Sequence, residues 1–308
     1  MPPALHTVMY HYVRDLPRTK YPRIKGMLAD DFVAQVDALA REYEMATLES
    51  ALAFLAGRYE PRRDLCLLTF DDGVAEHHDL VTPVLAERGI EGQFFLITSA
   101  VEEHTVAPVH MNHFLMAALD FADYRSEMLA RFGCSDDGVD EATARATYKW
   151  DTIEVARFKY LFNFTMAAEV RDGAVKSLFE DRIGDEADFA RELYVSWEQA
   201  RAMQSAGQRI GGHTHWHRPV SSLNAEELAF DLGSCRRLLE ANCAPQTLWP
   251  FSYPYGKRAS YTDESVAMLG ELGFACSFTT EVGPSGAGAA PFHIRRVDCK
   301  NALDGVAV

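Results

Sequence analysis

The amino-acid sequence predicts an α/β fold, built either as a β/α barrel or as a doubly wound parallel sheet. Seven short apolar or β-rich segments recur along the chain, and several are separated by stretches with helical apolar spacing. Strands that alternate with helices pair in parallel through right-handed crossovers. The seven segments are residues 6–13, 65–70, 93–99, 209–212, 248–253, 275–280 and 293–299.

Four amphipathic stretches predict helices between these strands. The first has apolar residues at positions 32, 36, 39 and 40, and the second follows Asp79, with His77 and His78 expected at its exposed start. The third begins after Asn224, a preferred N-cap residue, and the fourth ends at Gly273, the usual residue after a helix.

Residues 101–193 interrupt this alternation with a long run of helix-like apolar spacing. We interpret them as a helical insertion at the rim of a single domain that spans residues 1–308. An insertion at the rim would narrow the groove and favour a small substrate over a long polymer.

The bulk composition is that of an ordinary soluble globule, with 48% hydrophobic and 24% charged residues. A net charge of -15 argues against nucleic acid and anionic membranes as partners. We expect no membrane-spanning segment, because no apolar run approaches the ~20 residues needed. No leader segment and six scattered cysteines predict a cytoplasmic protein with reduced thiols, although a secreted chain without its leader would read the same way.

Two adjacent carboxylates, Asp71 and Asp72, follow the apolar segment 65–70 and precede Gly73. Paired acids behind a buried strand are costly unless a cation meets them. A cap on the following helix is the simpler alternative, because Asp commonly bonds free backbone amides there. This segment alone leaves both interpretations open.

A pair of histidines favours the first interpretation. His213 and His217 are four residues apart, so a helix or a tight turn would bring their imidazoles to one face. Gly211 and Gly212 allow the chain to turn sharply before them. Two imidazoles and one carboxylate suit a divalent metal with open positions, and Asp71 or Asp72 supplies the third ligand.

Three motifs in this order resemble those of the polysaccharide deacetylases, also called the NodB-homology domain or carbohydrate esterase family four. They are residues 69–73 (Thr-Phe-Asp-Asp-Gly), 213–217 (His-Thr-His-Trp-His) and 251–256 (Phe-Ser-Tyr-Pro-Tyr-Gly), and weaker similarity extends from near residue 8 to about 298. The resemblance implies a distorted (β/α)7 barrel of the polysaccharide deacetylase type, with the insertion within it.

The resemblance also implies a ligand set for a divalent metal. Asp72, His213 and His217 would bind the ion, with Zn²⁺ expected first and Co²⁺, Mn²⁺ or Ni²⁺ as alternatives. Asp71 would act as general base beside them.

The third motif would complete the reaction centre. The backbone N–H of Tyr255 is implied to hold the oxyanion, and Pro254 would stiffen the turn. Trp216 is a candidate for stacking on a sugar ring, although a tryptophan packs more often in a core or rim.

The sequence departs from the family pattern at two points. Ser252 stands where the family often has an Arg that orients the base, and Arg296 is the cation that could replace it. The usual late Leu-x-His motif, which supplies a general acid, has no clean match. His293 is the nearest candidate for this acid, and His11 competes with it.

We therefore predict a metal-dependent hydrolase that removes an N-acyl group, chiefly acetyl, from an amino sugar in surface-glycan or lipopolysaccharide biosynthesis. A nucleotide sugar and a lipid-linked glycan are both candidate substrates. Two alternatives remain at this stage. The same site could cleave another C–N bond, in a formamido-sugar or a cyclic ureide, or the protein could be a carbohydrate-binding pseudoenzyme.

Overall fold

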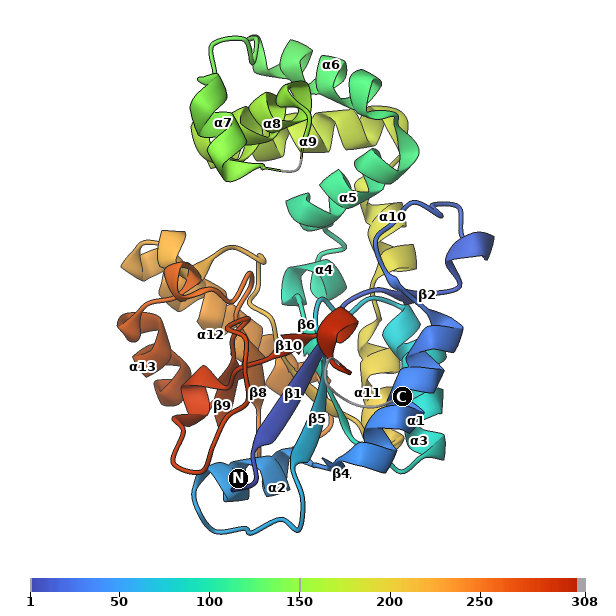
Figure 1. Ribbon diagram of the computed structural model, residues 1–308, viewed down its shortest axis with the longest axis vertical. Helices are drawn as coiled ribbons and strands as arrows, with labels where there is room; N and C mark the ends of the chain where they lie inside the picture. The colour runs from blue at the N-terminus through green and yellow to red at the C-terminus, as the bar shows by residue number, and fades with distance from the viewer. Residues whose placement is uncertain (1, 150, 304–308) are drawn as a thin grey trace. The chain divides into compact units, whose positions relative to one another are not determined.

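The computed structural model describes residues 2–149 and 151–303, and these form two compact units (Figure 1). The first, here called the barrel unit, contains residues 2–15, 25–105 and 190–303. The second, the helical unit, contains residues 16–24 together with 106–189. The sequence did not predict that residues 16–24 would join the helical segment.

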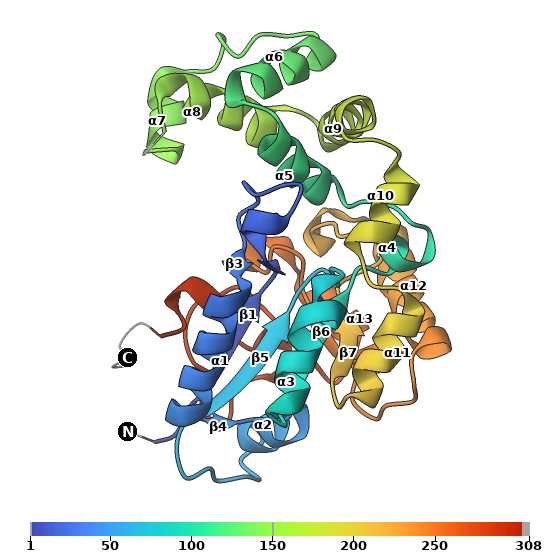
Figure 2. The same cartoon turned by 90° about the vertical axis from the view of Figure 1, so that its right-hand side faces the viewer.

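A curled parallel sheet forms the centre of the barrel unit, with helices around it (Figures 1 and 2). Its strand order is β10-β1-β5-β6-β7-β8-β9, and β4 also pairs with β5. The strands are β1 (Leu5–Tyr10), β4 (Glu44–Met45), β5 (Leu65–Phe70), β6 (Gly92–Leu96), β7 (Arg209–Gly212), β8 (Pro250–Ser252), β9 (Cys276–Phe278) and β10 (Val297–Asp298). Every predicted segment overlaps one of these strands, and the predicted barrel type is confirmed as a parallel half-barrel. Within this sheet, the two-residue β4 lacks a counterpart in the prediction. A second, two-stranded sheet pairs β2 (Val13–Arg14) with β3 (Met27–Leu28) in parallel, and β3 also lies outside the predicted segments.

The last strand segment lies between β9 and β1. Ile294 forms a parallel bridge with Phe278 of β9, and Val297 pairs with Val8 of β1. Between these two pairings, the backbone N–H of Arg296 donates to the carbonyl of Glu281 over 3.0 Å. This irregular stretch therefore brings Arg296 to the sheet between β9 and β1.

Seven α-helices accompany the strands of the barrel unit, and Figure 2 shows α1, α3 and α11 packed along the sheet. They are α1 (Ala29–Glu42), α2 (Leu48–Leu55), α3 (Thr82–Glu87), α4 (Thr98–Glu102), α11 (Trp197–Ser205), α12 (Ala225–Asn242) and α13 (Asp263–Glu271). The four predicted helices correspond to α1, α3, α12 and α13. Asn224 caps α12 by accepting two backbone N–H groups, and Gly273, at φ +77°, follows α13, so both end signals are confirmed.

Stacked aromatic rings join three neighbouring strands. Tyr10 is in register with Phe70, and Phe70 is in register with Phe94. The Tyr10 and Phe70 ring centroids are 5.0 Å apart, and those of Phe70 and Phe94 are 4.6 Å apart. Each such pair stabilises the fold by about 0.5–1.5 kcal/mol beyond burial. The stack holds the strand end from which Asp71 and Asp72 continue.

The helical unit has its own aromatic core. It contains α5 (Pro108–Ala118), α6 (Phe121–Phe132), α7 (Glu141–Thr147), α8 (Ile153–Tyr160) and α9 (Ala168–Arg182), while α10 (Glu186–Leu193) leads back to the barrel unit. The Phe189 ring lies 4.8 Å from Phe114 and 5.0 Å from Phe179. Tyr21 adds the segment 16–24 to this core through a 5.0 Å contact with Phe114.

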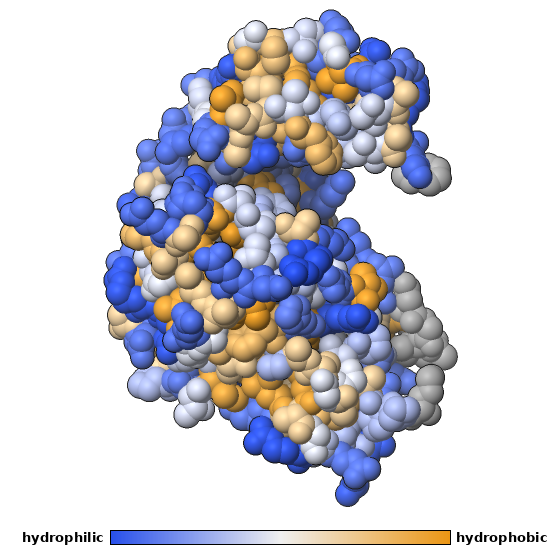
Figure 3. Space-filling model, turned by 90° about the vertical axis from the view of Figure 1, so that its left-hand side faces the viewer, coloured by the Kyte–Doolittle hydropathy of each residue, from blue (hydrophilic) through white to orange (hydrophobic). Residues whose placement is uncertain are grey.

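The face drawn in Figure 3 is mainly hydrophilic, with apolar patches scattered over it. Among residues 2–149 and 151–303, no helix has both the length and the apolar character needed to cross a membrane.

Candidate metal centre and catalytic site

Three side chains from two strand ends meet in the barrel unit. Asp72 follows β5, and His213 and His217 lie in the turn after β7. One ligand atom from each residue lies within 4.8 Å of the others, and all three residues are buried. Of the two acids that could have completed the histidine pair, Asp72 is the one in this cluster.

The spacing of these atoms fits a small divalent ion. Asp72 Oδ1 lies 3.5 Å from His213 Nε2 and 3.3 Å from His217 Nε2. A tetrahedral zinc site with bonds of about 2.0–2.1 Å places its ligand atoms about 3.3–3.4 Å apart. Two imidazoles and one carboxylate form a three-ligand set that leaves a position open, which is typical of catalytic rather than structural sites.

The His213 imidazole is oriented by the neighbouring strand. Its Nδ1 lies 2.7 Å from the carbonyl oxygen of Ser252, to which Nδ1–H donates, so that Nε2 faces Asp72 as the acceptor. Burial lowers the pKa of His213, but the carboxylates of Asp71 and Asp72 outweigh it and raise the pKa overall. The same carboxylates therefore attract a cation to this point, whether a proton or a metal.

Backbone strain is concentrated around the cluster. Among the described residues other than glycine, five have φ in the left-handed region, and four of these are Asp72 (+79°), Thr214 (+65°), His217 (+56°) and Tyr255 (+63°). Such conformations cost about 1–3 kcal/mol each and collect at functional sites. The histidine motif is therefore a tight left-handed turn and not a helix.

Arg296 holds the second acid, Asp71, in a bidentate ion pair. Its Nη1 and Nη2 each lie 2.8 Å from one carboxylate oxygen of Asp71, and both side chains are buried. The other N–H groups donate to the Thr279 carbonyl (2.8 Å), to Thr69 Oγ1 (3.3 Å) and to Ser252 Oγ (3.0 Å). The guanidinium thus lies beside Ser252.

This pair determines the charge of Asp71. Burial alone would raise the pKa of Asp71, but Arg296 and His213 oppose it and bring the pKa to about 2. Asp71 is therefore an anion at neutral pH, with both oxygens held in place.

His11, at the end of β1, also approaches Asp71. Its Nε2 lies 3.8 Å from Asp71 Oδ2, and its side chain is 43% exposed. His77 Nε2 lies 2.8 Å from the His11 carbonyl oxygen. His77 is fully buried, which lowers its pKa to about 4, so our expectation that it is exposed was wrong. A π-helical turn, His77–Val81, carries its ring against Phe70 and Phe94.

The third motif forms a turn beside the histidines. Tyr255 is half exposed, and its ring centroid lies 5.5 Å from that of His217. The turn is tied to the segment after β9, because Thr280 donates from Oγ1 to the Tyr255 carbonyl over 2.7 Å and from its N–H to the Gly256 carbonyl over 2.9 Å. Pro254 is buried immediately before Tyr255.

Two further candidates, Trp216 and His293, make their contacts with residues other than Asp71 and Asp72. The half-buried Trp216 stacks on the exposed Phe230, with ring centroids 5.0 Å apart. The His293 ring lies 5.7 Å from Tyr261, and His293 lines a hollow of about 280 Å³ with Glu281. Among the described residues, no hydrogen bond, ion pair or ring contact links His293 to Asp71.

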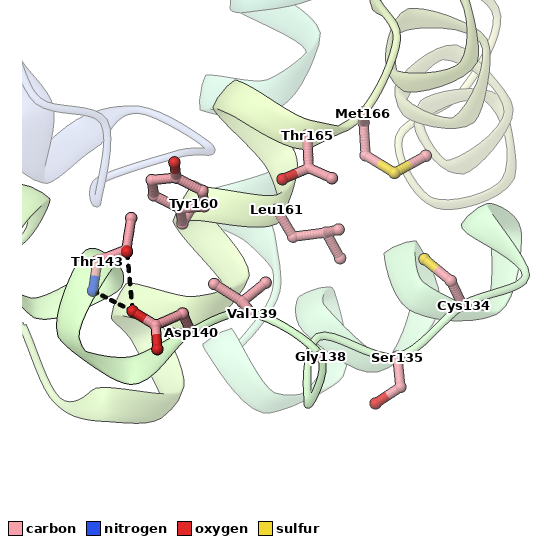
Figure 4. Close-up of a pocket in the computed structure, with 10 residues that line it drawn as sticks. All are labelled: Cys134, Ser135, Gly138, Val139, Asp140, Thr143, Tyr160, Leu161, Thr165 and Met166. Carbon is pink, nitrogen blue, oxygen red and sulfur yellow. Dashed lines mark hydrogen bonds between the residues drawn. The ribbon is translucent and has the colours of Figure 1, made fainter.

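A larger hollow of about 520 Å³ belongs to the helical unit and contains none of the candidate residues. Figure 4 shows apolar side chains such as Val139 and Leu161 around it. Asp140 at its edge caps α7 by accepting the N–H and Oγ1–H of Thr143, both over 2.8 Å.

Asp231 in α12 is a residue that sequence reasoning missed. It is fully buried, and its carboxylate accepts the backbone N–H groups of His215 and Trp216. A polar residue within the apolar stripe of Leu228, Leu232 and Cys235 was the signal that could have revealed it.

Comparisons with known proteins agree with this architecture. The family described as Polysaccharide deacetylase matches residues 58–276, which is more than half of the chain. A comparison with curated proteins gave no match.

Solved structures similar to this chain include IcaB from Ammonifex degensii, at 21% identity and a TM-score of 0.58, covering 96% of this chain and 92% of that one. The Streptococcus pyogenes deacetylase PplD in complex with acetate has 13% identity, a TM-score of 0.61 and full coverage of both chains at 100%. A de-N-acetylase from Aggregatibacter actinomycetemcomitans has 14% identity, a TM-score of 0.57, and coverage of 96% and 95%. These likenesses show the fold, and the family match shows that the chain belongs to the polysaccharide deacetylases.

Proposed function

We propose that this protein is a metal-dependent hydrolase that removes the N-acetyl group from an amino sugar during surface-glycan biosynthesis. The observation that carries the proposal is the buried cluster of Asp72, His213 and His217, with the ionised Asp71 held beside it by Arg296. The names of two similar structures, a deacetylase in complex with acetate and a de-N-acetylase, support acetyl as the group removed.

Asp72, His213 and His217 would hold the ion, with Zn²⁺ the first choice because its bond lengths match the ligand spacing. When bound, a divalent ion supplies Lewis acidity, which polarises a carbonyl and makes water a stronger acid. Asp71 then accepts the proton of the water that attacks the acyl carbon. The Arg296 ion pair keeps Asp71 anionic and fixes its orientation.

The backbone N–H of Tyr255 would donate to the oxyanion that develops on the acyl oxygen. Its turn lies beside His217 and is held by Thr280 and the buried Pro254. The backbone carries this role without a rotatable side chain, so the donor is oriented before the substrate binds.

The C–N bond breaks when the leaving amine receives a proton, and we propose that His11 delivers it. His11 is half exposed and lies 3.8 Å from Asp71, so it can face both the base and an incoming substrate. His293 packs against Tyr261, which makes it the weaker candidate for this step.

The proposed substrate is an amino sugar on a nucleotide or lipid carrier. Trp216 and Phe230 form a stacked pair whose outer member is 53% exposed, and such faces bind sugar rings well. A nucleotide sugar and a lipid-linked glycan both remain candidates. We also propose a cytoplasmic location, supported by four thiols buried in the core.

A substrate panel tests the activity. Metal-quantified protein is incubated with N-acetylated nucleotide sugars, N-acetylated oligosaccharides, formamido-sugars and cyclic ureides, and released acetate, formate or ring-opened product is measured. We expect acetate from an N-acetylated sugar and loss of its release in Asp71→Asn by about 10²–10⁴-fold. Formate or ring opening as the main product would favour the alternative hydrolase.

If the protein were a carbohydrate-binding pseudoenzyme, it would bind sugar saturably and release no product, even when Zn²⁺, Co²⁺ or Mn²⁺ is supplied. The ion pair between Arg296 and Asp71 weighs against this alternative, because Arg296 provides the cation that Ser252 cannot.

A further inference from the structure

We infer that Asp231 is a positioning residue of the proposed metal centre, which holds the turn 213–217 in the conformation that aims its two histidines at Asp72. The inference rests on the proposed metal-dependent function, and concerns a residue that does not itself reach the ligand atoms. The turn 213–217 is called the histidine turn below.

The carboxylate of Asp231 binds the middle of the histidine turn. Its Oδ1 accepts the backbone N–H of His215 over 3.0 Å, and its Oδ2 accepts that of Trp216 over 3.0 Å. One ionised group thus holds two consecutive amides, and hydrogen bonds to a charged acceptor are stronger than neutral ones. These two amides lie between the ligands His213 and His217.

The conformation that needs this support is a strained one. Thr214 has φ +65° and His217 has φ +56°, so left-handed residues lie on both sides of the amides that Asp231 binds. Residues other than glycine keep such a conformation only where surrounding contacts impose it. Without those contacts the turn would relax, and the two Nε2 atoms would no longer converge on Asp72.

Neighbouring contacts fix the rest of the turn. The His217 N–H donates to Thr214 Oγ1 over 2.8 Å, and the Ser99 N–H donates to the His215 carbonyl over 3.1 Å. The His215 ring lies between Thr98 Oγ1 at 3.0 Å and Glu103 Oε1 at 3.1 Å. Asp231 adds the bonds at the central amides, from a helix that is anchored in the barrel core.

The position of Asp231 in α12 argues that it is retained for this contact. Leu228, Leu232 and Cys235 share its buried face and belong to the hydrophobic core. A carboxylate at such a place is unfavourable unless its partners compensate for lost hydration. Burial accordingly raises the pKa of Asp231, and the two amides of the histidine turn oppose that rise.

The test measures metal affinity on metal-free protein. Asp231→Asn keeps the shape of the side chain but replaces one acceptor oxygen by an N–H donor that faces a backbone N–H. We expect its Kd for Zn²⁺, measured by competition with a chromophoric chelator, to rise by about 10–100-fold. The visible spectrum of bound Co²⁺ should change as well, because it reports ligand geometry.

Leu232→Ala is the matched control. Leu232 is the next residue of α12 and is fully buried in the core, so its truncation destabilises the helix packing without removing a bond to the histidine turn. We expect lower thermal stability with the Zn²⁺ Kd and the Co²⁺ spectrum of the wild type.

Different results would contradict the proposed function and the role of Asp231. A wild-type protein that binds no Zn²⁺ would remove the proposed function itself. Wild-type affinity in Asp231→Asn would overturn the inference alone, as would equal weakening in Leu232→Ala. An Asp231→Asn chain without native circular dichroism would make the carboxylate a requirement of the fold and would also overturn it.

Discussion

Asp71 and Arg296 illustrate how single residues decide the chemistry of this site. An isolated buried carboxylate would be raised in pKa and partly neutral, whereas the bidentate guanidinium keeps Asp71 ionised with a pKa of about 2. A base that is anionic at neutral pH is available without prior deprotonation, although a low pKa makes it a weak proton acceptor. Arg296 therefore lowers the driving force for proton transfer to Asp71, but it fixes the charge and the orientation of the Asp71 carboxylate.

Removing the guanidinium should shift both stability and pH dependence. In Arg296→Gln, the largest opposition to burial is lost while His213 still lowers the value, so the Asp71 pKa rises from about 2 toward its ordinary 3.8. As the pH falls, Asp71 is then protonated at a higher pH than in the wild type. Activity that needs the Asp71 anion is lost at that pH, so the acid limb of kcat/KM moves to higher pH. Stranding the buried carboxylate should also lower the free energy of unfolding by about 3–5 kcal/mol.

The exposed neighbour Arg295 supplies the control for this change. Arg295→Gln should keep the wild-type pH profile and urea midpoint. An unchanged acid limb in Arg296→Gln would contradict the role given to the ion pair.

His77 makes a separate prediction about stability and pH. Its pKa falls from an ordinary 6.5 to about 4 in the folded protein, so the unfolded state binds the proton more readily between these values. Stability present above pH 6.5 is therefore lost as the pH falls toward 4, by about 2 kcal/mol at pH 5. Urea unfolding of wild type and His77→Gln at pH 7 and pH 5 measures this, since Gln cannot take up the proton. An equal loss of stability in both proteins would be incompatible with a buried neutral His77.

The spacing of His213 and His217 predicted a metal site with Asp71 or Asp72 as third ligand, and the family resemblance implied Asp72. Arg296 was named as the cation that could stand in where the family has an Arg and this chain has Ser252, and it contacts Ser252 in the structure. Asp231 and the burial of His77 were not predicted, because each depends on a contact between distant segments.

At the scale of elements, the site depends on the close packing of β6, β7 and β8 next to the strand end that leads to His213. Gly211 lies within β7, and a Cβ there would clash with the carbonyl oxygen of Pro250 in β8 and lie 2.8 Å from the Phe95 ring of β6. The three strands can therefore pack at this distance only with glycine at this position. His213 follows two residues later.

Gly211→Ala should force β7 away from its neighbours and displace His213. We expect a loss of about 1–3 kcal/mol in unfolding free energy from overpacking, together with weaker Zn²⁺ binding. Gly233→Ala in α12 is the matched change, because a Cβ there meets nothing within 4 Å. Replacing this helical glycine should instead stabilise the protein by about 0.5–1 kcal/mol. Chemical denaturation of both variants checks the opposite signs.

Strands and helices were predictable from the sequence where an apolar run or a capping residue marks them. The fully buried β5 and the capped α12 follow directly from an apolar run and an Asn cap. The two-residue β4 has no such pattern. The left-handed conformation of Thr214 and His217 is equally absent from the sequence, because L-residues rarely adopt it without tertiary contacts.

At the scale of the whole molecule, the proposed ligands all belong to the barrel unit, while the helical unit has a separate aromatic core. The helical character of residues 106–189 follows from their apolar spacing. The sequence did not predict that residues 16–24 belong to the same unit, because this depends on a contact between Tyr21 and Phe114, which are more than ninety residues apart in the sequence.

Metal binding should accordingly protect only part of the chain. Hydrogen exchange with and without Zn²⁺ should show slower exchange in the segments that carry Asp72 and the histidine turn, with little change in residues 106–189. At a free Zn²⁺ concentration about 100 times Kd, the linked gain in stability is about 2.7 kcal/mol. Comparable protection of the helical unit would contradict a metal site confined to the barrel unit.

The central claim is that bound metal and amide hydrolysis belong to one site, and a metal titration of turnover tests it most directly. Metal-free protein is loaded stepwise with Zn²⁺, and acetate release from an N-acetylated amino sugar is measured against metal bound per chain. We predict that release rises linearly to one ion per chain, and that Asp72→Asn loses high-affinity Zn²⁺ binding and acetate release together. Acetate release at the full rate from metal-free protein, or from Asp72→Asn, would contradict the claim.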